Sequence, residues 1–79
     1  MKVIYFKDTD TLLVIFSENK IAEIKEVNEN TIIELDDLGN VVSMTIEHAK
    51  KQTEISSFSF NQISDNFPVS NIFPANARL

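Results

Sequence analysis

The chain has 79 residues, which is enough for one small domain but not for a second hydrophobic core. Its hydrophobic content of 43% is that of an ordinary globular protein, and the absence of cysteine excludes disulfide bridges and thiolate chemistry. The net charge of −5 comes from 12 carboxylates against 7 basic side chains, which argues against binding to nucleic acid.

Two strands are predicted near the N-terminus. In Lys2–Phe6, Val3 and Tyr5 alternate with Ile4 and Phe6, and Lys7–Asp10 follows as a turn. Thr11–Phe16 is apolar on both faces, a pattern that predicts a strand inside the sheet that is covered on each side. A cover for the sheet is therefore expected.

The next segment, Ile21–Val27, alternates apolar and charged residues after a predicted turn at Ser17–Lys20. Its composition also suits a short helix. A strand is the better interpretation, because Asn28–Asn30 then forms a hairpin turn into the following strand. Its charges suit a sheet edge, where they discourage edge-to-edge aggregation.

The strongest predicted strand pair is Thr31–Asp36 with Val41–Glu47. Gly39 is the only glycine, and glycine at a turn supplies a positive φ without a Cβ clash. We expect the side chains between the two strands to serve the turn; they are Asp36, Asp37, Gly39 and Asn40. Asp36–Asn40 does not match the spacing of a calcium loop, and a single glycine excludes a glycine-rich phosphate loop.

One or two helical turns are predicted for His48–Glu54. His48 is the only histidine and could act as a general base oriented by Glu47 or Glu34. No serine lies in a nucleophile-elbow pattern, so a surface histidine at a helix start is the preferred interpretation. Asp8 and Asp10 could suggest Mg²⁺ or Ca²⁺ ligands, but turn and capping roles are the better interpretation. We therefore expect no enzyme activity, no cofactor and no metal site.

The composition changes after Ile55. Ser56–Leu79 contains both prolines and four of the six phenylalanines, but only two charged side chains. Proline excludes a central strand, and few charges with many aromatic rings are untypical of a solvated tail. We expect an extended arm whose rings pack on the sheet, on an exchanged subunit or on a partner; the rings are Phe58, Phe60, Phe67 and Phe73.

These elements predict an α+β, mostly β fold: an antiparallel meander sheet of four to five strands, one short helix and an extended C-terminal arm. Residues 1–55 form the domain and residues 56–79 the arm. Because so small a core is marginal, we expect a homodimer. No apolar run reaches the roughly 20 residues that span a bilayer, so a cytoplasmic protein without membrane contact is expected.

The chain resembles the domain-of-unknown-function 2283 family of short acidic bacterial proteins over about residues 1–51. The resemblance rests on Asp8-x-Asp10-x-Leu12, the acidic stretch Glu26–Glu29 and, above all, Asp36-x-x-Gly39-Asn40-Val41-Val42 with the downstream Ala49. Members of the family typically open with a Tyr-x-x-x-x-Asp-x-Leu-type segment. Two positions depart from the family pattern. Ser43 stands where the family usually has glycine, and Lys50 stands where it usually has serine.

The resemblance supplies no catalytic residues. It implies an antitoxin-like role, since genes of this family often lie beside genes for small basic toxin-like proteins. With the acidic composition, this favours a non-enzymatic protein–protein interaction module that binds a small basic partner. The alternative is a small oligomeric protein that binds a ligand or metal at a subunit interface.

Overall fold

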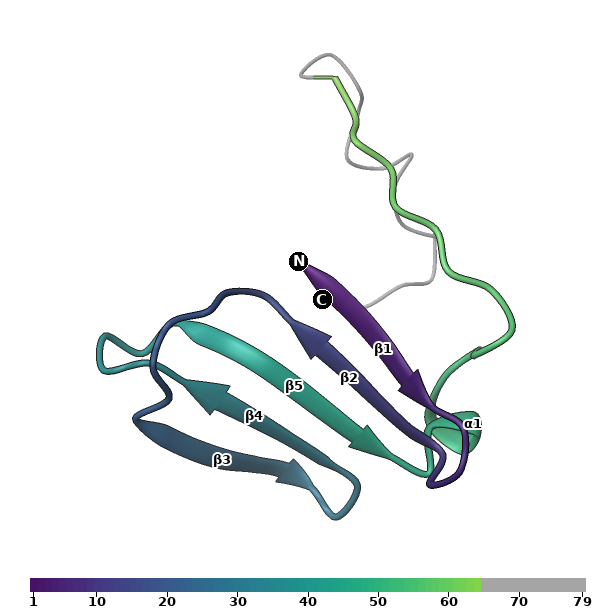
Figure 1. Cartoon of the computed structure of the whole chain (residues 1–79), viewed down its shortest axis with the longest axis horizontal. Coiled ribbons are helices and arrows are strands. Elements are labelled where there is room, and N and C mark those ends of the chain that lie inside the picture. Colours follow the sequence, from purple (N-terminus) through teal and green to yellow (C-terminus); the bar gives the residue numbers. More distant parts are fainter. Residues whose placement is uncertain (65–79) are drawn as a thin grey trace, which may run out of the picture.

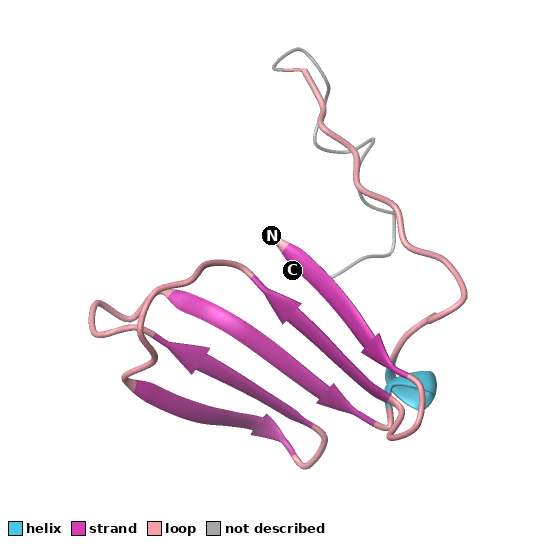
Figure 2. Cartoon of the chain, viewed as in Figure 1, coloured by secondary structure: helices cyan, strands magenta, loops and turns pink. Residues whose placement is uncertain are grey.

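The computed structural model describes residues 1–64, which form one antiparallel sheet and one short helix (Figure 1). The elements are β1 Lys2–Phe6, β2 Thr11–Ile15, β3 Glu23–Asn28, β4 Thr31–Leu35, β5 Val41–Glu47 and α1 Ala49–Gln52. Figure 2 shows that strands outweigh the single short helix in the described part of the chain. The predicted mostly β class is confirmed: the sheet expected to have four to five antiparallel strands has five, and there is one short helix.

The spatial order of the strands is β1-β2-β5-β4-β3. Two meander segments, β1–β2 and β3–β4–β5, are therefore joined by pairing β2 with β5 (Figure 1). The chain after β2 crosses the ends of β5 and β4 before β3 begins. Backbone hydrogen bonds of 2.8 Å fix this crossing, from Phe16 N to the carbonyl oxygen of Val42 and from Ala22 N to that of Leu35.

This crossing explains why the third strand begins later than the sequence predicts. The third strand begins at Glu23 rather than Ile21, because the preceding residues extend past two other strands instead of making a tight turn. As predicted, this strand lies at an edge of the sheet, and Thr11–Ile15 lies inside it. The helix has a single turn of four residues.

The hydrophobic core of the described chain is thin. Among residues 1–64, the buried apolar side chains are Leu35, Val42 and Ala49, and no large side chain is completely buried. Every residue of β2 remains half-buried. The cover predicted for both faces of this strand is therefore missing within the described residues, because the only helix there is too short to lie over a sheet.

The described part of the arm does not provide that cover. After α1 the chain runs away from the sheet (Figure 1), and Phe58 and Phe60 are 68% and 67% exposed. Of the three alternatives for the arm, packing on its own sheet does not describe Phe58 and Phe60, whereas packing on an exchanged subunit or on a partner stays a prediction. Phe67 and Phe73 lie outside the described residues.

Candidate interaction surfaces

The strand register places most apolar side chains on one face of the sheet. One continuous row runs across four strands through Val3, Val14, Met44 and Ile33. Alternation along each strand adds the remaining members of this face. We call it the apolar face; it comprises Val3, Tyr5, Leu12, Val14, Ile33, Leu35, Val42, Met44 and Ile46.

The apolar face lacks charge over most of its width. On β1, β2, β4 and β5 it carries no charged side chain, and the two charged residues that share it, Glu23 and Lys25, lie on edge strand β3. Leu35 and Val42 are buried, whereas most other members remain half-buried. Water therefore reaches a contiguous apolar surface.

The opposite face mixes carboxylates with branched apolar side chains. A row across it joins Ile4, Leu13, Thr45, Ile32 and Glu26. We call this surface the mixed face; it comprises Lys2, Ile4, Phe6, Thr11, Leu13, Ile15, Ile24, Glu26, Ile32, Glu34, Ser43, Thr45 and Glu47. Three neighbouring strands each contribute one carboxylate to it.

A polar pair of side chains lies near one end of the mixed face, on its two neighbouring strands β4 and β5. Ser43 and Glu34 are directly opposite each other on β5 and β4, and the hydroxyl of Ser43 donates a hydrogen bond to the carboxylate of Glu34. Ser43 is only 5% exposed, so this bond satisfies its buried hydroxyl. Ser43 thus holds one of the three carboxylates in place.

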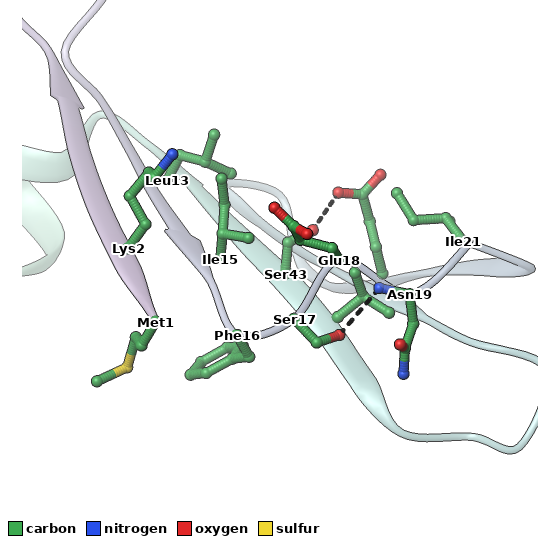
Figure 3. Close-up of a pocket in the computed structure, with 12 residues that line it drawn as sticks. Met1, Lys2, Leu13, Ile15, Phe16, Ser17, Glu18, Asn19, Ile21 and Ser43 are labelled. Carbon is green, nitrogen blue, oxygen red and sulfur yellow. Dashed lines mark hydrogen bonds between the residues drawn. The ribbon is translucent and has the colours of Figure 1, made fainter.

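The same pair lines a hollow of about 580 Å³ (Figure 3). Lys2, Leu13 and Ile15 reach into it from β1 and β2, whereas Met1 and Phe16 point to the other side of the sheet. The hollow therefore belongs to the mixed face and lies beside the crossing segment between β2 and β3.

The turn residues predicted from the sequence surround Asp36. Its carboxylate accepts hydrogen bonds from the backbone N–H groups of Leu38 and Asn40, both 2.9 Å, and from the side-chain amides of Asn40 and Asn19. The bond from Asn40 N is the main reason that the pKa of Asp36 lies below its ordinary value, although burial opposes this shift. Gly39 has a φ of 84°, and Asp37 is exposed.

The bond between Asp36 and Asn19 has a further consequence. Asn19 lies in the segment that crosses from β2 to β3, so the 3.1 Å bond fastens this segment to the β4–β5 turn. The turn predicted from a local pattern therefore also secures a long-range connection of the sheet.

A second hub, Asp10, joins the first turn to the helix. Asp10 accepts a 2.6 Å hydrogen bond from the hydroxyl of Tyr5, and its carbonyl accepts one from Ala49 N. Its carboxylate also accepts bonds of 3.2 and 3.4 Å from Lys50 N. Ala49 is completely buried, so Asp10 and Ala49 together anchor α1 at the corner of the sheet.

His48 precedes this helix and is exposed. Its Nδ1 lies 2.9 Å from Oδ1 of Asn30, so a neutral amide contacts the ring rather than Glu47 or Glu34. With a φ of 53°, it makes a left-handed corner between β5 and α1. Its visible role is therefore to redirect the chain.

Two further features bear on the class of protein. Among residues 1–64, no group of three or more histidine or carboxylate side chains is arranged to hold a metal ion. No helix in that same part has the length and hydrophobicity that crossing a membrane requires.

The fold and its surfaces define a small single-sheet antiparallel β domain with one apolar and one mixed face. The chain belongs to the family described as protein of unknown function (DUF2283), whose model matches residues 2–50. This confirms the resemblance seen in the sequence. No curated protein and no solved structure matches the chain significantly.

The family motifs fall on the two hubs. Tyr5, Asp10 and Ala49 meet at the helix, and Asp36, Gly39 and Asn40 form the β4–β5 turn. Structural roles therefore suffice to explain these motif residues. The surfaces that could contact other molecules lie elsewhere, on the two faces of the sheet.

Proposed function

We propose that this domain is a non-enzymatic protein-interaction module that binds a small basic protein through its mixed face, in the manner of an antitoxin. The observation that carries the proposal is the placement of Glu26, Glu34 and Glu47 on three neighbouring strands of one face. Exposed or half-buried isoleucines lie between these carboxylates.

The composition of the mixed face suits a binding surface. Ile24 is 61% exposed beside Glu34, and Ile32 is half-buried between Glu26 and Thr45. Non-obligate interfaces combine apolar contact area with a polar rim in this way. The isoleucines would provide contact area, and the carboxylates would select a cationic partner.

The overall charge favours the same kind of partner. Of the charged residues, 11 acids and 6 bases lie in residues 1–54, so the acidic excess belongs to the folded part of the chain. Complementary potentials accelerate the encounter of an acidic surface with a basic protein and disfavour other acidic proteins.

The test is capture of partners by the full-length tagged chain in its native cell, with two matched variants. Glu26→Gln/Glu47→Gln removes two exposed carboxylates from the mixed face and leaves the Ser43–Glu34 bond intact. Asp8→Asn/Asp37→Asn removes the same charge from exposed turns.

We expect the wild-type chain and the turn variant to capture the same small basic protein. The mixed-face variant should retain much less of it, and added salt should release it from the wild type. Equal capture by all three chains, or captured proteins that are not basic, would refute the proposal.

A further inference from the structure

We propose that the apolar face binds the apolar face of a second copy of this chain, so that two single sheets form a two-layer β-sandwich. This inference is independent of the basic partner, because it concerns the opposite surface. In this arrangement, the second copy covers the apolar face of the sheet.

The need for a cover follows from the thin core. Domains are built from at least two packed layers, but residues 1–64 provide one sheet and a four-residue helix at its corner (Figure 1). The apolar face measures roughly 19 Å across its four strands and roughly 17 Å along them. Contiguous apolar patches of this size are often functional, whereas single exposed apolar side chains are ordinary surface.

The distribution of charge favours the apolar face, rather than the mixed face, as the interface between two copies. Stacking two mixed faces would bring Glu34 and Glu47 of both copies into a water-excluded space, which is costly for unpaired carboxylates. The apolar face has charges only on β3, where Glu23 and Lys25 have opposite signs and lie at the edge. Two copies of an acidic chain can therefore meet there without opposing carboxylates at the centre.

A second copy is the occupant that matches these requirements. A face that must be covered for the fold to persist needs a partner that is always present, and an identical chain always is. Self-complementary twofold interfaces are the commonest form of such association. The described arm does not compete for this role, since it leaves the sheet and exposes Phe58 and Phe60.

The first experiment measures the mass of the full-length chain by light scattering and sedimentation. We expect 18.0 kDa, twice the 9.0 kDa of one chain, and an unfolding midpoint that rises with protein concentration. A 9.0 kDa species that unfolds cooperatively at high concentration would overturn the proposal.

Two matched substitutions on β5 locate the interface. Met44→Glu puts a carboxylate at the centre of the apolar face, and we expect it to weaken dimerisation by about a hundredfold or more. Thr45→Glu adds the same charge to the adjacent residue on the mixed face, and its dimer should persist. Loss of the dimer in the Thr45 variant alone would overturn the assignment.

A measurement on the wild-type chain shows which face forms the dimer interface, even if the Met44→Glu variant does not fold. In dimers mixed from labelled and unlabelled chains, intermolecular NOEs should join methyl groups of Val14, Ile33 and Met44. Intermolecular contacts confined to Leu13 and Ile32 of the mixed face, or to the arm, would contradict a sandwich built from apolar faces.

Discussion

The hydroxyl of Tyr5 donates a 2.6 Å hydrogen bond to Oδ1 of Asp10, across the turn between β1 and β2. The same carboxylate accepts the N–H of Lys50, which lies 40 residues later in the helix. Asp10 thus connects Tyr5 of β1 with the helix α1. Asp10 has a φ of 55°, a conformation that aspartate and asparagine tolerate better than most residues.

The Tyr5–Asp10 bond should raise the pKa of the Tyr5 phenol above 10.0. The hydrogen bond to Asp10 is the main cause, followed by burial and by the negative charge of Asp10. Tyr5 is the only tyrosine and the chain has no tryptophan, so ultraviolet absorbance reports its titration directly. Asp10→Asn should shift this pKa toward 10.0, and Asp8→Asn should leave it unchanged.

This shift also fixes the sign of a pH effect on stability. A raised pKa in the folded state means that the stabilisation from the protonated phenol is complete below pH 10.0 and is lost as the pH rises through the folded pKa. Tyr5→Phe should remove this part of the alkaline loss of stability. An unchanged alkaline profile would mean that the bond does not form in solution.

Asp36 should make the fold sensitive to acid. Because its folded pKa is below the ordinary value of 3.8, its stabilisation is present above pH 3.8 and is lost as the pH falls through the folded pKa. Asp36→Asn should lower the melting temperature at neutral pH and flatten its fall in acid. Asp37→Asn, at the adjacent exposed position, is the control; equal melting curves for both variants would contradict this role.

Replacing Gly39 should cost stability through the backbone alone. Its φ is 84°, but an added Cβ would meet no atom within 4 Å, so conformational strain is the only penalty. Gly39→Val should destabilise the fold by about 1–2 kcal/mol, which corresponds to a fall in melting temperature of roughly 4–16 °C. Gly39→Asn should lose less, since asparagine tolerates this conformation. Equal losses for valine and asparagine would contradict the explanation.

Phe58 and Phe60 should contribute little to the stability of the sheet. Both rings are about two-thirds exposed, so Phe58→Ser/Phe60→Ser removes few contacts from the described fold. We expect the melting temperature and the dimer mass to stay at their wild-type values. Dissociation of this double variant into monomers would instead show that the arm is exchanged between subunits.

Local patterns predicted the elements of this fold well. Alternation in Lys2–Phe6 and Val41–Glu47 yielded strands with the observed bounds, because side-chain period and strand geometry are local properties. The position of the single glycine likewise located the turn with positive φ. The third strand was predicted two residues too early, since nothing in Ile21 or Ala22 reveals a crossing segment.

The roles of Asp10 and Asn19 were not predictable in the same way. Asp10 was assigned to a turn, but its bond to Lys50 joins residues far apart in the chain. Asn19 was likewise placed in a turn, whereas its amide contacts Asp36. Hydrogen bonds between distant segments depend on how strands are ordered, and strand order leaves no local pattern.

The sequence by itself determined the class of fold, the turn at Gly39 and the membership of the family, because each depends on local geometry and residue type. Only the tertiary structure decided that β2 pairs with β5 and that Val14, Met44 and Ile33 form one row. The two strands lie far apart in the sequence, so local patterns do not reveal that they pair. Their pairing extends the apolar face from β4 and β5 to β2 and β1, and that face has no cover among residues 1–64.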